Sequence, residues 1–158
     1  MGFSLREGDH ILTSKGGGGI MTINIEGIMI PVKNQDRALK FYTEKLGYTT
    51  VRFNGLSPET DPQRWIEVIK PGEEFGLVLY THPDFTDMVG KNMNVVFRTN
   101  DIQKAYAELK SKDVEFVVAP PAQASWGTYV RIKDSEGNVF CVGQLNKCES
   151  PGNGSSCG

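Results

Sequence analysis

The chain has 158 residues, a formal net charge of −2, 39% hydrophobic residues and 23% charged residues. This length allows one domain, or two small fused halves, with a sizeable core. The near-neutral charge gives no electrostatic reason to expect nucleic acid or an anionic membrane as a partner. No apolar run approaches the roughly 20 residues that a membrane helix needs, and the N-terminus lacks the apolar segment of a secretion signal. Three cysteines make an odd number, which argues against a disulfide framework and indicates a reducing cytoplasm.

The composition of the two ends sets them apart from the rest of the chain. Residues 1–20 finish with four consecutive glycines, and we predict a flexible extension or a remnant of cloning there. Residues 147–158 are rich in Gly and Ser, which predicts a flexible tail. The folded domain is therefore expected over residues 21–146.

The stretch from Ile28 to Phe53 is predicted to form a strand, a helix and a second strand. Asn34 can cap the helix, because its side-chain oxygen accepts from unpaired backbone N–H groups. Gly47 can end it, because glycine accepts the left-handed backbone of a C-terminal cap. Between them, apolar residues recur at helical spacing: Ala38, Leu39, Phe41, Tyr42 and Leu46.

The same pattern returns about 67 positions later, from Asn94 to Val118. Here Asn100 or Asp101 is the expected cap, and the helical stripe contains Ile102, Ala105, Tyr106 and Leu109. Each copy is followed by two further strand patterns around a turn-rich linker. The sequence therefore predicts an α+β fold of two βαβββ repeats, at about residues 21–81 and 93–145.

Three polar or turn-rich segments are predicted to be loops. They are residues 54–63, 81–93 and 119–127. The last contains Pro120 and Pro121, which cannot donate to a strand ladder and so exclude a central strand.

Two groups of residues resemble the vicinal oxygen chelate superfamily, which includes glyoxalases, bleomycin resistance proteins and extradiol dioxygenases. The first group is Val32, Ala38, Phe41, Tyr42, Leu46, Gly47 and Tyr48, and the second is Trp126, Gly127, Asp134, Gly137 and Asn138. The resemblance implies that each repeat curls into a half-barrel and that paired half-barrels enclose a cleft. It also implies a symmetric homodimer.

Metal-dependent members of that superfamily carry His, Glu or Gln at four positions. Residue by residue, these positions fall on Gly27, Asn94, Cys141 and the neighbourhood of Tyr80. None is a strong ligand in its neutral form, because glycine has no side chain and the phenol and thiol ionise above neutral pH. We therefore predict no metal and no other cofactor.

Strand alternation selects the side chains that are expected to line the cleft. Ile66, Val68, Val130 and Ile132 are assigned to the helix-covered side. The opposite side then carries Met29, Trp65, Glu67, Val78, Tyr80, Asn94, Val96, Tyr129, Arg131 and Cys141. Trp126 is expected at the cleft mouth as a lid, a stacking platform or a surface-packed aromatic.

Three titratable residues keep alternative interpretations. Glu67 could meet a cationic ligand, act as a base or face water, and His82 could be an acid/base group or a solvated loop histidine. Cys141 has no nearby base in its strand, so a small buried hydrophobe is favoured over a nucleophile.

An apolar and aromatic wall with few polar groups is typical of a small-molecule pocket. We therefore predict a metal-independent binding protein for an aromatic or cationic organic molecule. The alternative is a metal-dependent lyase, isomerase or dioxygenase of the same superfamily. The sequence does not decide whether the protein is an enzyme.

Overall fold

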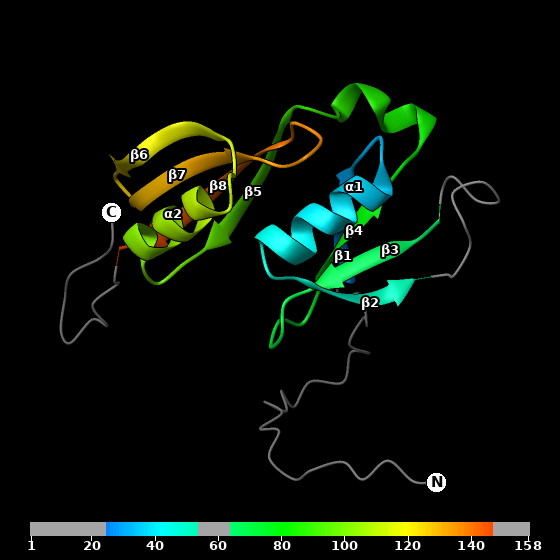
Figure 1. The fold of residues 1–158 in the computed structure, drawn as a ribbon, viewed down its shortest axis with the longest axis horizontal. Helices are drawn as coiled ribbons and strands as arrows, with labels where there is room; N and C mark the ends of the chain where they lie inside the picture. The colour runs from blue at the N-terminus through cyan, green and yellow to red at the C-terminus, as the bar shows by residue number, and fades with distance from the viewer. Residues whose placement is uncertain (1–24, 54–63, 147–158) are drawn as a thin grey trace, which may run out of the picture.

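The computed structural model describes residues 25–53 and 64–146, as two four-stranded sheets that lie side by side (Figure 1). The expected extension, the loop at 54–63 and the tail lie outside these residues. The first sheet has the order β1-β4-β3-β2 and contains β1 (Gly27–Pro31), β2 (Thr49–Phe53), β3 (Ile66–Ile69) and β4 (Gly76–Tyr80). The second has the order β5-β8-β7-β6 and contains β5 (Asn92–Arg98), β6 (Phe116–Ala124), β7 (Gly127–Lys133) and β8 (Val139–Leu145).

The two sheets share one topology. In each, the opening strand lies parallel to the last strand of its unit, and the remaining neighbours are antiparallel. A helix follows the opening strand in both units, because parallel strands require a crossover connection. The predicted duplication of a βαβββ unit is therefore confirmed.

The helices begin at the caps that the sequence indicates. Asn34 precedes α1 (Gln35–Lys40) and accepts a hydrogen bond from the Arg37 backbone N–H at 2.9 Å. Asp101 precedes α2 (Ile102–Ser111) and accepts from the Lys104 N–H at 3.0 Å. The first helix continues as a π-helical segment, η1 (Phe41–Lys45), and Gly47 follows it with a φ of 73°. This left-handed backbone is the reason for glycine at the end of the helix.

Strand β6 differs from the prediction. The expected strand ended at Val118 and gave way to a loop, but β6 continues to Ala124 and contains both prolines. It is an edge strand, and its pairing with β7 shifts register between Val118 and Ala122. The prolines are accommodated because an edge and a bulge leave backbone groups that need not donate to the ladder. The expected loop at 81–93 contains a 3-10 helix, η2 (Pro83–Met88).

One hydrophobic core joins the two units beneath their helices. Ile66, Val68, Val130 and Ile132 are fully buried in it, as strand alternation predicts. Phe140 of the second unit links it to the first: its ring centroid lies 6.4 Å from that of Tyr42. No helix within residues 25–53 and 64–146 is long and apolar enough to cross a membrane.

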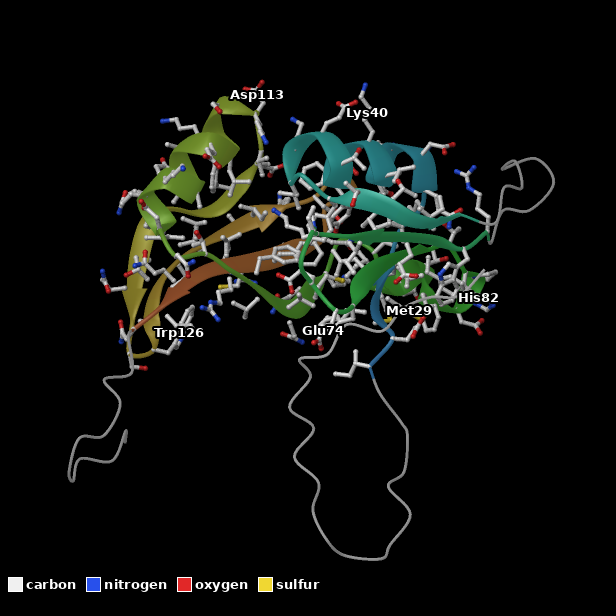
Figure 2. The ribbon with its side chains drawn as sticks, turned by 90° about the horizontal axis from the view of Figure 1, so that it is seen from below. Met29, Lys40, Glu74, His82, Asp113 and Trp126 are labelled. Atoms are coloured by element: carbon white, nitrogen blue, oxygen red, sulfur yellow. The ribbon has the colours of Figure 1, made fainter. Side chains whose placement is uncertain are left out.

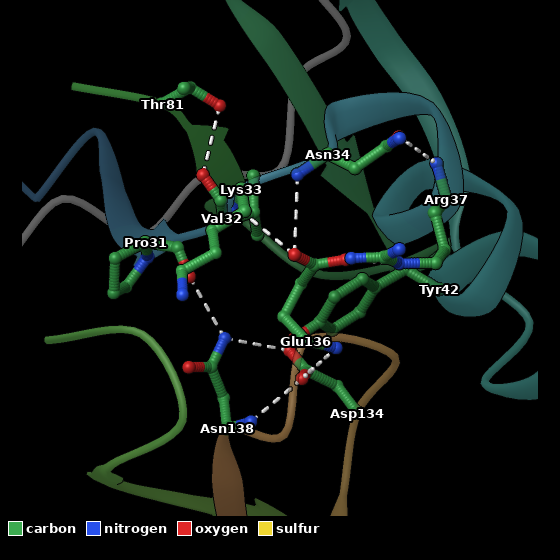
Figure 3. Close-up of polar contacts among 10 residues, drawn as sticks. All are labelled: Pro31, Val32, Lys33, Asn34, Arg37, Tyr42, Thr81, Asp134, Glu136 and Asn138. Atoms are coloured by element: carbon green, nitrogen blue, oxygen red, sulfur yellow. Dashed lines mark hydrogen bonds and ion pairs between the residues drawn. The ribbon is translucent and has the colours of Figure 1, made fainter. Parts of the chain in front are cut away.

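The turn between β7 and β8 fastens the second unit to the first (Figure 3). The Tyr42 hydroxyl donates to Asp134 Oδ2 at 2.9 Å, and Asn138 Nδ2 donates to the Pro31 carbonyl at 2.9 Å. Burial raises the pKa of Asp134, although hydrogen bonds from Asn138, the Glu136 N–H and Tyr42 partly lower it. The Glu136 carboxylate, whose side chain is fully buried, accepts from the Lys33 and Asn34 N–H groups at 2.9 and 3.2 Å. The motif residues Asp134 and Asn138 therefore hold the two units together.

Candidate functional site

Two aromatic rings form an exposed surface on the second sheet. The ring centroids of Trp126 and Tyr129 lie 5.5 Å apart with an interplanar angle of 32°. The indole covers Gly143, where an added Cβ would lie 2.8 Å from the Trp126 ring and 3.6 Å from Val96 Cγ1. Glycine at this position is thus what allows the indole to lie close to the strand. We call Trp126, Tyr129 and Val96 the aromatic platform; Trp126 is 40% exposed and Val96 55% exposed.

A positive charge and a thiol adjoin the aromatic platform. Cys141 of β8 pairs in register with Val96 on one side and with Arg131 on the other. Burial raises the pKa of the Cys141 thiol, and the neighbouring Arg131 charge only partly lowers it. The thiol is therefore protonated at neutral pH, and Arg131 supplies a positive charge beside it.

Asn94 lies at a distortion of β5. Its φ of 53° is in the left-handed region, and the pairing of β5 with β8 shifts register between Asn92 and Val96. Its side-chain oxygen accepts from Asn92 Nδ2 at 2.9 Å. Bulges of this kind redirect side chains and are frequent beside functional sites. Asn94 is exposed and supplies an amide at the opening strand of the second sheet.

The first sheet carries the other predicted residues. Met29 and Trp65 are 46% and 36% exposed, whereas Glu67 is 5% exposed and Val78 is 1% exposed. The Tyr80 ring stacks on His82, with a centroid distance of 5.8 Å and an interplanar angle of 7°. These residues form an apolar and aromatic surface, and Glu67 is largely buried rather than exposed on it.

The structure divides the predicted cleft residues between the two sheets. Trp126 and Met29 lie well apart on different units in Figure 2, and His82 lies beyond Met29. Trp65 and Glu67 belong to the first unit and Tyr129 to the second, so the wall predicted from these three residues stays a prediction. One wall made from both sheets would require a second copy of the chain.

The four positions implied for a metal do not form a ligand set. A Cβ added at Gly27 would lie 3.2 Å from the Gly76 carbonyl oxygen and 3.3 Å from Val78 Cγ2, so the strand is crowded there. In the described parts of the chain, no group of three or more His, Cys, Asp or Glu residues is placed to hold a metal ion. The donors at these positions do not fit a divalent metal.

A cavity between the two units was missed by the sequence reasoning. It has a volume of about 520 Å³ and is lined by both units, including Tyr48, Phe97 and Leu109. Of the predicted cleft residues, it contains only Val96. Its strand residues Ile28 and Leu77 belong to the helix-covered side, which strand alternation assigns to the core. We call it the inter-unit cavity.

Comparison with known proteins shows the family. The model of the Glyoxalase/Bleomycin resistance protein/Dioxygenase superfamily matches residues 24–142, and the chain belongs to this superfamily. It is 34% identical over 122 residues to YetH of Bacillus subtilis (strain 168), covering 77% of this chain and 98% of that protein.

Solved structures of this superfamily have the same fold. A member from Sphaerobacter thermophilus DSM 20745 is 28% identical with a TM-score of 0.67, covering 77% of this chain and 97% of that one. TnmS3, an antibiotic binding protein from Streptomyces sp. CB03234, is 25% identical with a TM-score of 0.65, covering 80% of this chain and 99% of that one. The resemblance stated from the sequence motifs is therefore confirmed.

Proposed function

We propose that the protein binds a flat, partly aromatic organic molecule on the aromatic platform, without a metal, and sequesters it rather than transforming it. The observation that carries the proposal is the exposed pair of Trp126 and Tyr129, which lies against Gly143. An aromatic contact contributes about 0.5–1.5 kcal/mol beyond the burial of apolar area. A flat ligand could use this contribution at both rings.

Arg131 determines the charge preference in this proposal. The cationic ligand expected from sequence depended on Glu67 lying beside Tyr129. Glu67 is on the other sheet and is 5% exposed, whereas Arg131 adjoins the platform through Cys141. We therefore propose neutral or anionic aromatic ligands in preference to cations.

A homodimer is part of the same proposal. Several large apolar side chains are exposed on the sheets of one chain, including Met29, Trp65, Val96 and Leu145. Apolar surface of this kind is often covered by a partner. If the first sheet of one copy faces the second sheet of another, Trp65 and Tyr80 would face the aromatic platform. An interface of standard size would bury about 1,600 Å² in total.

Two further observations favour binding over catalysis. TnmS3, which shares this fold, is an antibiotic binding protein. The residues at the superfamily's metal positions do not form a ligand set, and His82 packs on Tyr80 and Phe85 of the first unit, away from the aromatic platform. The odd cysteine count and the raised pKa of Cys141 fit a protonated thiol in a reducing cytoplasm.

Isothermal titration with three flat probes tests the proposal. Acridone is neutral, acridine-9-carboxylate is anionic and 9-aminoacridine is cationic, and all three share one ring system. We expect acridone and the carboxylate to bind saturably, and Trp126→Ala to weaken both about ten-fold, which corresponds to the loss of one aromatic contact. Tyr106→Ala, which removes an aromatic ring from α2 on the opposite side of the second sheet, is the matched control and should leave binding unchanged. Binding that survives Trp126→Ala, or that only the cation shows, contradicts the proposal.

A further inference from the structure

The inter-unit cavity has the size and lining of a ligand site. Its volume of about 520 Å³ lies within the roughly 300–1,000 Å³ of typical small-molecule pockets. Phe97 and Leu109 contribute apolar wall from the second unit, and Ile28 contributes it from the first. These three residues lie on the helix side of the sheets, whereas Trp126 and Tyr129 lie on the opposite side of the second sheet. The cavity reaches the platform only at Val96, which lines both, and the rest of its apolar wall is a different part of the fold.

Two equivalent lysines tie the helices together at this cavity. Lys45 Nζ donates to the Lys112 carbonyl at 2.6 Å and to the Asp113 carbonyl at 3.2 Å. Lys112 Nζ donates to the Lys45 carbonyl at 3.1 Å. The two residues occupy the same position in the two repeats, since 112 − 45 = 67, and both line the cavity. Their reciprocal bonds hold the helix ends together and keep two positive charges at the cavity wall.

The duplication also explains why the cavity exists. Glu136 lies three residues before β8, and Glu73 lies three residues before β4, so the two turns correspond. The turn of Glu136 is packed against the start of α1, where the buried carboxylate accepts from Lys33 and Asn34. Glu73 is instead exposed and borders the cavity, whose lining also includes α2 residues. Figure 2 shows Glu74 of the same turn at the junction of the two units. The Glu136 turn of the second unit therefore packs against the helix of the first unit, whereas the equivalent Glu73 turn of the first unit leaves the cavity beside the helix of the second.

The charges of the lining favour an anion. Its cationic residues are Lys45, Lys70, Arg98 and Lys112, and its acidic residues are Glu73 and Glu108, so the sum is +4 − 2 = +2. Most of these charged side chains are exposed at the rim, while Leu77 and Leu109 are buried in the walls.

Tyr48 adds a hydrogen-bond donor to the cavity. Lys70 Nζ lies 5.4 Å from its ring centroid. Burial, and secondarily the charge of Glu73, raises the pKa of Tyr48 to about 12. The hydroxyl therefore stays protonated at neutral pH and can donate to an oxygen of a bound anion.

We propose that the inter-unit cavity binds an amphipathic monoanion, with its apolar or aromatic body against Phe97 and Leu109 and its carboxylate toward Lys70. The proposal does not depend on the aromatic platform. Because the ligand contacts both units, it stabilises their packing and raises the melting temperature of the protein by mass action.

The test uses 2-naphthoate and its neutral isostere 2-naphthamide, followed by amide chemical shifts in NMR titrations. We expect 2-naphthoate to bind saturably, to shift the amides of Thr99 and Ala105, and to bind at least about five-fold tighter than 2-naphthamide. The variant Lys70→Glu should weaken 2-naphthoate at least about five-fold. Its matched control is Lys104→Glu, which changes the net charge equally on α2 outside the cavity lining and should alter binding less than about two-fold.

A filling variant provides a second test that retains all charges. Ala105→Leu places a larger side chain in the cavity and should weaken both naphthalene probes. The proposal is overturned if 2-naphthoate gives no saturable shift at millimolar concentration, or if Lys70→Glu and Lys104→Glu weaken it equally. It is also overturned if the shifts fall on Trp126 and Tyr129 instead, a result that would leave the proposed function of the aromatic platform standing.

Discussion

Replacement of Glu136 by alanine should destabilise the contact between the two units. The Glu136 side chain is fully buried and accepts hydrogen bonds from two backbone N–H groups of the first unit, those of Lys33 and Asn34. It also accepts from Arg37 Nε at 2.7 Å, but the Arg37 side chain is 56% exposed and water can replace that partner.

The magnitude follows from the two backbone bonds. Hydrogen bonds to a charged acceptor contribute about 1.5–3 kcal/mol each when buried. Because Lys33 and Asn34 are exposed residues, we assign about 1 kcal/mol to each of the two bonds. We therefore expect Glu136→Ala to lower the free energy of unfolding by about 2 kcal/mol. Glu136→Gln should lose about half as much, because an amide oxygen can still accept from the two N–H groups.

Urea denaturation measures this loss. With a slope of about 2 kcal/mol per molar urea, the midpoint of Glu136→Ala should fall by about 1 M. Glu115→Ala is the matched control, because the Glu115 carboxylate is 65% exposed and pairs with the Lys133 side chain of the neighbouring strand. Exposed pairs contribute about 0–1 kcal/mol. If Glu136→Ala loses no more stability than Glu115→Ala, the account of the contact between the units is refuted.

Three other outcomes are expected. Gly143→Ala should displace the Trp126 indole and shift its fluorescence to longer wavelength, because the added Cβ would lie 2.8 Å from the ring; a similar shift in a Trp126→Phe background would contradict this. In an ultraviolet pH titration, the phenol of Tyr48 should ionise near pH 12, and Tyr48→Phe should remove that step. Because the folded-state pKa is raised, the stability that Tyr48 contributes is complete below pH 10 and is lost as the pH rises toward 12; unfolding midpoints that are independent of pH in this range argue against it. The purified protein should carry no stoichiometric metal, and a chelator should leave its melting temperature unchanged; one tightly held ion per chain would refute this.

Local patterns in the sequence predicted local structure. The caps Asn34 and Asp101 follow from side-chain chemistry within four residues, and the burial of Ile66 and Val130 follows from strand alternation. These features depend on short-range sequence, so they can be recognised without knowing where the other unit lies. The extension of β6 could not be recognised in this way, because its prolines are tolerated only through its place at a sheet edge.

The candidate site depends on contacts between distant residues. Glu136 and Lys33 are 103 positions apart, and Lys45 and Lys112 are 67 apart. Alternation assigned Ile66 and Val130 to the buried side of their strands, but it carries no information about how two sheets are placed. For the same reason it could not separate the core from the inter-unit cavity, since both are built from helix-facing residues such as Ile28 and Leu77.

The position of bound acridone in a crystal structure of the complex tests the central claim most directly. The account predicts that the tricyclic ring stacks on Trp126 and Tyr129, near Arg131, with no metal ion between protein and ligand. Acridone bound on the first sheet alone, against Tyr80 and His82, or bound through a metal ion, would contradict it.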